Sequence, residues 1–358
     1  MEKNFTKDGL ILLNKSKGVS SFGAINHLKK VMKAKKVGHA GTLDPMAEGL
    51  MIVMINEATK FSDNLMKKDK EYYVEMELGY KTDTYDLEGT VIAKYDSEIN
   101  ISDSEIIQAV NSFKGKIKQV PPMYSAIKIE GQKLYDLARK GIEVERAERN
   151  VEISEIREIK VIRPDKNSEN AQNIKISFYA KVSSGTYIRS LVYDIGEKLG
   201  VFATMTRLVR TKIGRFEIED AISLEKAKAE IDKLKNLMEG KTENESFWAT
   251  KNDSAIRAEK IREIVCFVEI EYVLDYYGIN VSNVKYGKLK NGMTVIDTFK
   301  KFENISKDIK RQEHIKENQK FKIYVRNRGT QEREFKGIVK IISIRGNRIY
   351  LKRDKYFL

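Results

Sequence analysis

Residues 38–45 (GHAGTLDP) constrain the fold more than any other stretch, because a glycine-rich loop here is followed almost at once by an apolar run at 50–55 (LMIVMI). Glycine tolerates backbone conformations that other residues avoid, and it lets a ligand come close to the backbone. Pro45 biases Asp44, the residue before it, towards an extended conformation. The sequence therefore predicts a buried strand over 50–55 that is preceded by one carboxylate on a rigid loop.

Asp44 has two interpretations at this stage. An aspartate between glycines and a proline is most often an ordinary turn residue. A carboxylate is also ionised near neutral pH, so it can attack an electrophilic carbon and later leave. From the residues alone, Asp44 is a candidate nucleophile or base, and the turn interpretation stands beside it.

The composition indicates a globular protein with a polyanionic partner. Of the 358 residues, 41% are hydrophobic and 33% are charged, which is enough for a sizeable core and two domains. The formal net charge of +14 favours a partner rich in phosphate. Nucleic acid is the first candidate, and an anionic membrane surface is the second.

Other classes of protein are disfavoured by what the sequence lacks. No apolar run approaches the roughly 20 residues of a membrane helix, and residues 1–8 lack a signal-like apolar stretch. Cys266 is the single cysteine, which excludes an internal disulfide and a cysteine-built zinc site. No two of the three histidines have metal-ligand spacing: His27, His39 and His314. We therefore expect a cytoplasmic protein without a metal.

Strand patterns occur throughout the first 220 residues. Residues 72–80 alternate between apolar and charged side chains, as in a half-buried strand, and we expect them to form a hairpin with 89–95. These strands and the intervening helices indicate an α+β domain on a mixed, largely antiparallel sheet. The other expected strands lie at 9–13, 151–162, 173–183, 204–210 and 215–219.

Three helices are expected in the same region. Ser20 or Ser21 caps the first, and Ser102 begins the second with a capping-box pattern. The third begins after the sequence 184–186 and stops at Gly200.

The C-terminal part of the chain has a different character. Residues 226–262 are rich in Lys and Glu, and we interpret them as a charged insertion or linker with a helix at 226–238. Short strands are then expected at 321–325, 337–344 and 348–352. We therefore divide the chain into a domain at 1–279 and a small, basic, β-rich domain at 280–358.

The glycine-rich loop also carries a family resemblance. GHAGTLDP, followed by Glu48-Gly49 and by EATKF at 57–61, resembles the catalytic signature of the bacterial tRNA pseudouridine-55 synthases, the TruB family. The resemblance implies that Asp44 attacks the target uridine, either at C6 of the base or at the anomeric carbon of the ribose. Either route lets the uracil rotate and reattach through C5, and neither needs a cofactor.

Two further residues complete the catalytic group that the resemblance implies. Arg189 lies in SGTYIR at 184–189, and an arginine can hold a carboxylate in a fork of two hydrogen bonds. Helix arginines are more commonly on the surface, but the intact motif favours pairing with Asp44. Tyr72 matches the strand tyrosine of the family, which can stack on an extruded base. Its neighbour Tyr73 would face the other side of the strand.

Four residues are implied to bind substrate. His39 resembles the histidine that fills the gap left by the flipped nucleotide, and Leu208 matches an apolar residue that packs against the uracil. Tyr187 belongs to the same motif as Arg189. Lys15 matches a lysine near the active site, although Ser16 stands where the family usually has proline.

Two regions are expected to bind RNA outside the site. Residues 119–150 are basic with interleaved aromatic residues, a composition that suits phosphates and unpaired bases. They resemble the family insertion that clamps the T-loop of tRNA, and residues 280–358 resemble an RNA-binding PUA-type domain.

The function implied is therefore the isomerisation of uridine 55 in the T-arm of tRNA, on a base flipped out of the loop. We expect a monomer with tRNA as its partner, no membrane association and no obligatory protein partner. Two rivals are a guide-RNA-dependent relative, against which the 119–150 insertion argues, and a catalytically silent tRNA-folding protein. Retention of Asp44, Tyr72 and Arg189 argues against the silent protein.

Overall fold

The computed structural model describes most of the chain. The described residues are 8–125, 127–129, 131–164, 174–230, 267–269, 278–298, 317–327, 329–345 and 348–357. Within them, no helix has the length and apolarity needed to cross a membrane.

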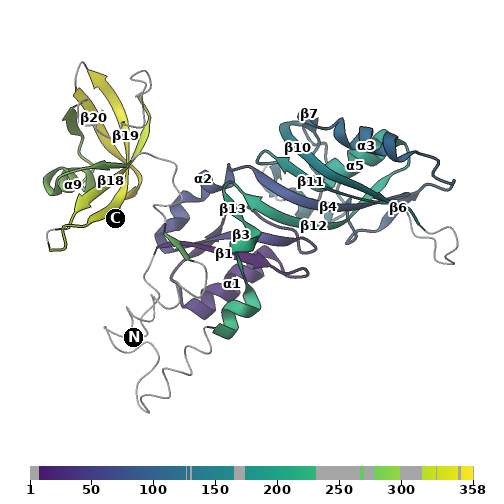
Figure 1. Cartoon of the computed structure of the whole chain (residues 1–358), viewed down its shortest axis with the longest axis horizontal. Helices are drawn as coiled ribbons and strands as arrows, with labels where there is room; N and C mark the ends of the chain where they lie inside the picture. Colours follow the sequence, from purple (N-terminus) through teal and green to yellow (C-terminus); the bar gives the residue numbers. More distant parts are fainter. Residues whose placement is uncertain are drawn as a thin grey trace, which may run out of the picture.

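A large mixed sheet forms the body of the first domain (Figure 1). Two of its pairings are parallel, β1 with β14 and β3 with β12, and the others are antiparallel. This confirms the predicted α+β class and the largely antiparallel sheet. The central order is β14 (Ile222–Ser223), β1 (Gly9–Lys15), β3 (Glu48–Ile55), β12 (Ala203–Ile213), β4 (Lys70–Leu78), β11 (Lys175–Val182), β10 (Arg149–Ile162) and β7 (Gly115–Gln119), with β2 (Val37–His39), β13 (Phe216–Glu217) and β15 (Phe267–Glu269) at its sides.

The helices begin and end where local signals predict. Ser20 caps α1 (Ser21–Met32), Ser102 and Glu105 form a capping box on α3 (Asp103–Asn111), and Gly200 ends α5 (Ile188–Leu199) in a left-handed conformation. The shorter helical elements are η1 (Asn56–Phe61), α2 (Ser62–Met66), α4 (Leu134–Ala138) and η2 (Ile218–Asp220).

Strand β3 is buried on both faces, which explains its unbroken apolar sequence. Met51, Val53 and Ile55 belong to the core that α1 and α5 share with the sheet. Leu50, Ile52 and Met54 face a second cluster on the other side. A strand that lies between two apolar layers has no polar face to present, so alternation is lost. The loop that carries Asp44 is thus joined directly to the most buried strand.

Strand β4 shows the alternation that its sequence predicts. Tyr72, Val74, Met76 and Leu78 are buried, whereas the residues between them are only partly covered. The ring of Tyr73 lies on the opposite face, 5.1 Å from the ring centroid of Tyr179.

The predicted hairpin of 72–80 with 89–95 is wrong for residues 72–79, and only Tyr80 pairs as expected. Strand β4 pairs with β11 and β12 on its two sides, so both of its edges are taken by strands more than 90 residues away in sequence. Gly79, with φ of +105°, ends β4, and the chain then turns into β5 (Tyr80–Thr82), which pairs with β6 (Val91–Lys94). The hairpin therefore exists only as this short extension.

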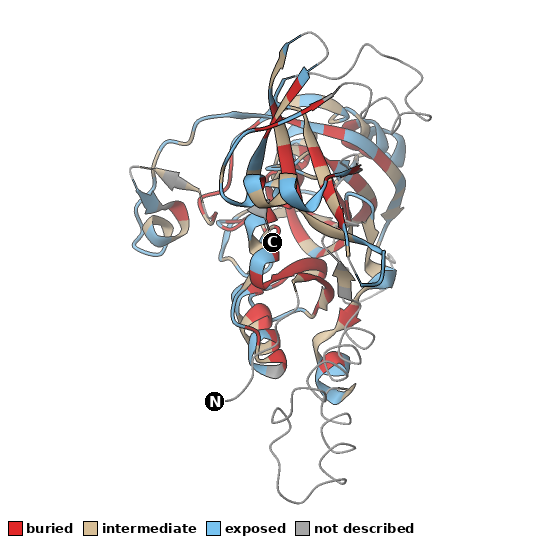
Figure 2. Cartoon of the chain, turned by 90° about the vertical axis from the view of Figure 1, so that its left-hand side faces the viewer, coloured by how far each residue is buried: buried red, intermediate tan, exposed pale blue. Residues whose placement is uncertain are grey.

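The C-terminal region has a separate five-stranded sheet, confirming a β-rich domain. Buried residues alternate along its strands (Figure 2), and Ile323, Ile341 and Leu351 are among the members of its own core. Phe335 and Ile338 on β19 instead pack with the cluster around Phe61 of the first domain. The order is β16 (Gly278–Asn280), β18 (Lys320–Arg326), β19 (Arg333–Arg345), β20 (Arg348–Phe357) and β17 (Val295–Thr298), with α9 (Asn283–Lys290) alongside.

Two expectations fall largely outside the described residues. Residues 224–230 are helical, but the rest of the expected helix at 226–238 and of the 226–262 segment is not described. Within 119–150, the described residues form a small hairpin of β8 (Lys128–Ile129) and β9 (Gln132–Lys133), followed by α4.

Gly49, at the start of β3, gives a direct test of this packing. Its φ is +106°, and a β-carbon there would lie 2.4 Å from the carbonyl oxygen of Arg210 on β12. We expect Gly49→Ala to lower the free energy of unfolding by about 3 kcal/mol or more, from overpacking together with backbone strain. Urea denaturation measures it. Gly18→Ala is the control, because Gly18 also has positive φ but no atom within 4 Å of the added carbon. Equal losses in the two variants would contradict the packing argument.

Candidate active site

The loop carrying Asp44 is fixed by the start of α1. The Ser21 hydroxyl donates to the carbonyl oxygen of Leu43 and accepts from its amide, at 2.8 Å in each case. The amide of Gly18 donates to the carbonyl oxygen of Pro45 at 2.8 Å. These bonds hold the residues on both sides of Asp44, so the carboxylate has a set position.

Lys15 also holds the loop, through a bond to its backbone. Its side chain is buried, and Nζ donates to the carbonyl oxygens of Val19 at 2.7 Å, Ser16 at 3.0 Å and Pro45 at 3.3 Å. Burial lowers the pKa of the Lys15 ammonium to about 8, an effect that the nearby Asp44 charge partly opposes. Lys15 is therefore placed to hold the loop.

Arg210, at the far end of β12, ties the first half of the loop to the sheet. It is 1% exposed, and its guanidinium donates to the carbonyl oxygens of Leu50 at 2.7 Å, Gly41 at 3.2 Å and Thr42 at 3.4 Å. A buried cation that bonds to carbonyls in two separate segments keeps the loop and β3 in one arrangement.

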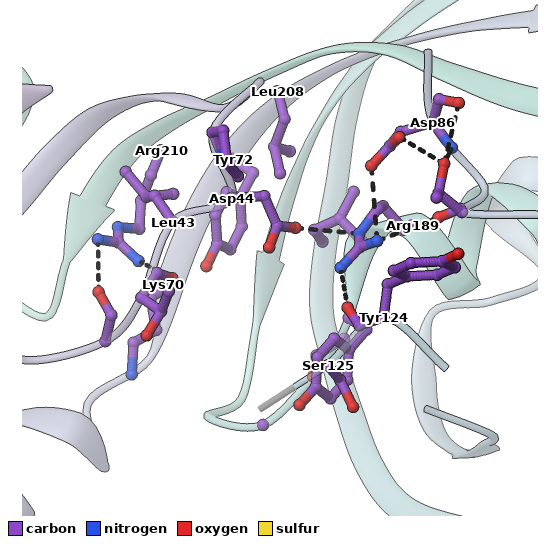
Figure 3. Close-up of a pocket in the computed structure, with 18 of the residues that line it drawn as sticks. Leu43, Asp44, Lys70, Tyr72, Asp86, Tyr124, Ser125, Arg189, Leu208 and Arg210 are labelled. Carbon is purple, nitrogen blue, oxygen red and sulfur yellow. Dashed lines mark hydrogen bonds and ion pairs between the residues drawn. The ribbon is translucent and has the colours of Figure 1, made fainter. Parts of the chain in front are cut away.

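Arg189 lies in the first turn of α5 and contacts Asp44 directly (Figure 3). Its Nε is 3.0 Å from Oδ2 of Asp44, so the predicted pair is present. The predicted fork of two bonds to Asp44 is not, because the remaining donors are directed elsewhere. Nη1 donates to the carbonyl oxygen of Thr84 at 3.1 Å and lies 3.5 Å from Oδ2 of Asp86, and Nη2 donates to the carbonyl oxygen of Tyr124 at 2.7 Å.

Asp86 is a second carboxylate of the site, and it was not predicted from the sequence. It is 2% exposed, and its Oδ1 accepts from the Thr84 hydroxyl at 2.6 Å and from the Glu88 amide at 2.9 Å. Asp86 lies in the short segment between the strands predicted at 72–80 and 89–95, where no sequence motif marks it as a site residue. Arg189 thus bridges two carboxylates from different loops.

A cavity of about 610 Å³ opens over Asp44. Four of the expected site residues, Tyr72, Tyr187, Arg189 and Leu208, contribute to its wall. The insertion contributes as well, through Tyr124, Ser125, Tyr135 and Arg139, and Lys70 and Arg210 lie at the other end.

His39 and Lys15 are not among the residues that line this cavity. His39 lies on β2 opposite Val53, and within the described structure its Nδ1 is buried without a hydrogen-bond partner. Burial lowers the pKa of His39, and the charge of Arg210 lowers it further. The lowered pKa favours the neutral form of His39, which lies on β2 outside the lining of the cavity.

The electrostatics of Asp44 follow from its place in the cleft. Burial raises the pKa of the Asp44 carboxyl, the positive charge of Arg189 lowers it, and Asp86 raises it. The side chain still keeps 37% of its surface exposed, because the cavity opens on it. Asp44 is thus a carboxylate surrounded by protein on most sides, oriented by a cation and open to one incoming group.

Comparisons with known proteins give matches over most of the chain. Residues 29–188 match the model of the "TruB family pseudouridylate synthase (N terminal domain)", and residues 189–258 match that of the "tRNA pseudouridylate synthase B C-terminal domain". A tRNA pseudouridine synthase B of Fusobacterium nucleatum is 50% identical over 59% of this chain and 70% of its own length. One from Clostridium perfringens is 41% identical over 81% of this chain and 85% of its own length.

A solved structure, "Crystal Structure of a Cbf5-Nop10-Gar1 Complex", contains a chain with a similar fold. The TM-score is 0.61 at 22% identity, over 98% of this chain and 85% of that one. At this identity the likeness concerns the fold alone.

The titration of Asp44 tests the arrangement. We expect its pKa to lie above the ordinary aspartate value of 3.8, because burial is the largest influence, and Arg189→Met to raise it further by removing the opposing charge. Carboxyl NMR titration, with Asp44→Asn to assign the signal, measures both. Arg157→Met is the matched control, since Arg157 pairs with Glu71 instead of Asp44. A lower Asp44 pKa in Arg189→Met would contradict the pairing.

Proposed function

The chain belongs to the TruB family of pseudouridylate synthases, and we propose that Asp44 is the residue with which it attacks its uridine. The protein is a tRNA pseudouridine synthase, an isomerase whose target in this family is uridine 55 of the T-loop. The observation that supports the role of Asp44 is its ion pair with the buried Arg189 at the floor of the cavity.

The chemistry asks for an ionised, oriented carboxylate. Arg189 favours the charged form of Asp44 and sets its direction through the 3.0 Å contact, while Asp86 and two carbonyl oxygens hold the guanidinium itself. Attack at C6 of the base and attack at the anomeric carbon both use this carboxylate, and both break the N1–C1′ bond so that the uracil can rotate. C5 then bonds to C1′, the bond to Asp44 breaks, C5 loses its proton and N1 gains one.

The cavity suits one extruded nucleotide. Its volume of about 610 Å³ falls within the roughly 300–1,000 Å³ of small-molecule sites. Chemistry on a base inside folded RNA requires that base to leave the stack, and aromatic and apolar walls then replace its neighbours. We assign this packing to Tyr72, Tyr187 and Leu208, and we propose that His39, outside the cavity lining, fills the gap that the flipped nucleotide leaves.

RNA affinity comes from surfaces around the cavity. The insertion at 119–150 places Tyr135 and Arg139 in the cavity wall, where they can contact the T-loop beside the target base. The β-rich domain at 280–358 is proposed as a PUA-type RNA-binding domain, with the basic helix α9 on its surface. The charge of +14 supplies affinity largely independent of sequence.

We propose that the enzyme acts as a monomer in the cytoplasm without an obligatory protein partner. The similar solved structure is a complex of Cbf5 with Nop10 and Gar1. This chain has the 119–150 insertion instead, which favours a stand-alone enzyme. A role in tRNA folding can coexist with catalysis on the same surfaces.

Pseudouridine mapping on an unmodified tRNA transcript tests the catalytic residue. We expect the protein to modify the T-loop position, and Asp44→Asn to lower the single-turnover rate by about 10³-fold or more, because the neutral amide cannot attack. Asp220→Asn, an exposed aspartate on η2, is the matched control and should retain full activity. Full activity in Asp44→Asn would contradict the proposed role of Asp44. Modification only after other proteins are added would favour the guide-dependent rival.

The affinity for tRNA should depend strongly on salt. If lysines and arginines neutralise phosphates, log K for association falls linearly with log salt concentration, with a slope near the number of phosphates contacted. A titration of KCl from about 50 to 300 mM by filter binding would show it, with Asp44→Asn preventing turnover. A flat response would refute an electrostatic interface.

A further inference from the structure

Gln119 makes an unusual pair of bonds at the point where the insertion leaves the sheet. It is the last residue of β7 and is 2% exposed. Its Nε2 donates to the carbonyl oxygen of Tyr187 at 3.0 Å, and its Oε1 accepts from the amide of the same residue at 2.8 Å. Tyr187 is the residue directly before α5 and has no side-chain cap of its own. One buried amide therefore fixes the backbone at the start of the helix that carries Arg189.

Two more bonds join the same segments. The Ser190 hydroxyl donates to the carbonyl oxygen of Val120 at 2.8 Å. Nη2 of Arg189 donates to the carbonyl oxygen of Tyr124 at 2.7 Å. Residues 119–124 thus contact residues 187–190 through several bonds, and these contacts hold the root of the insertion to the first turn of α5.

The outer part of the insertion is linked to this root and reaches the cavity. The amide of Tyr135 donates to the carbonyl oxygen of Ser125 at 3.1 Å, and the amide of Leu134 donates to the carbonyl oxygen of Ile127 at 2.8 Å. Tyr135 and the exposed Arg139 line the cavity. Hydrogen bonds therefore connect the part of the insertion that lines the cavity to the backbone beside Arg189.

The chemistry of the link requires glutamine. A donor and an acceptor must meet one peptide group at the same time, which an amide does and a methionine of similar length does not. Glutamate keeps the acceptor for the Tyr187 amide but places a second acceptor against the Tyr187 carbonyl oxygen. Methionine, glutamate and glutamine thus give a graded series of zero, one and two bonds.

We propose that Gln119 is a positioning residue that couples engagement of RNA by the insertion to the seating of Arg189 against Asp44. This inference rests on the proposed function. It assigns Gln119 no contact with the uridine: its effect is on the position of Arg189, since small displacements of a catalytic group are costly in rate.

The experiment separates the rate of the chemical step from tRNA affinity. For Gln119→Met we expect a single-turnover rate at saturating tRNA about 10- to 100-fold below wild type. The tRNA Kd should stay within about threefold of wild type, and the rate of Gln119→Glu should lie between those of Gln119→Met and wild type. Gln108→Met, an exposed glutamine on α3, is the matched control and should leave both values unchanged.

A double-mutant cycle tests the coupling itself. Arg139→Met should slow the saturated rate in the wild-type background but have little further effect in Gln119→Met, because the link that would pass its contribution to Arg189 is already broken. Additive effects would show that the insertion acts independently of Gln119. The cycle can be repeated with Gln119→Glu if Gln119→Met does not fold.

Three outcomes would overturn the inference. An unchanged saturated rate with weaker tRNA binding would make Gln119 an affinity residue only. A lower melting temperature with a normal rate per folded molecule would make it merely structural. A saturated rate in Gln119→Met equal to that of wild type, with unchanged tRNA affinity, would show that Gln119 has no role in the reaction. Absence of pseudouridine with the wild-type protein would instead count against the proposed function, so the two failures are distinguishable.

Discussion

The rest of the site depends on the bonds that the guanidinium of Arg189 makes. A buried cation is costly unless it is paired and its donors are satisfied, and removing one partner leaves a charge uncompensated. Here the acceptors come from the Asp44 loop, the segment of Thr84 and Asp86, and the Tyr124 carbonyl of the insertion. Three segments far apart in sequence therefore converge on one side chain, and each depends on the others for its place.

The fold could be predicted where the signal was local. The apolar run of β3, the alternation of β4 and the capping box at Ser102 each depend on neighbouring residues, and the structure confirms all three. The hairpin at 72–95 failed because strand pairing is decided by non-local contacts. Both edges of β4 are taken by β11 and β12, and nothing in the local sequence distinguishes those partners from a nearer strand.

The site was predictable to the extent that its residues lie in recognisable motifs. Asp44, Arg189 and Tyr72 do, and the structure brings them together around one cavity. Asp86, Arg210 and Gln119 acquire their importance only from tertiary proximity, since each bonds to backbone or charge at a distance in sequence. Lys15 shows the converse: a motif predicts it near the site, and in the structure its ammonium donates to the Pro45 carbonyl oxygen of the loop and to two other backbone carbonyls.

Because β3 is buried on both faces, the two sides of the site differ in how firmly they are held. Asp44 is attached to a strand enclosed by apolar layers, a position whose amides should exchange with solvent only on global unfolding. About half of the described residues in the insertion opposite are exposed, and Met123 and Leu134 are among its few buried apolar residues. The entropy lost when RNA orders the complex is therefore expected to fall on the insertion, while the attacking carboxylate is already in place before the substrate arrives.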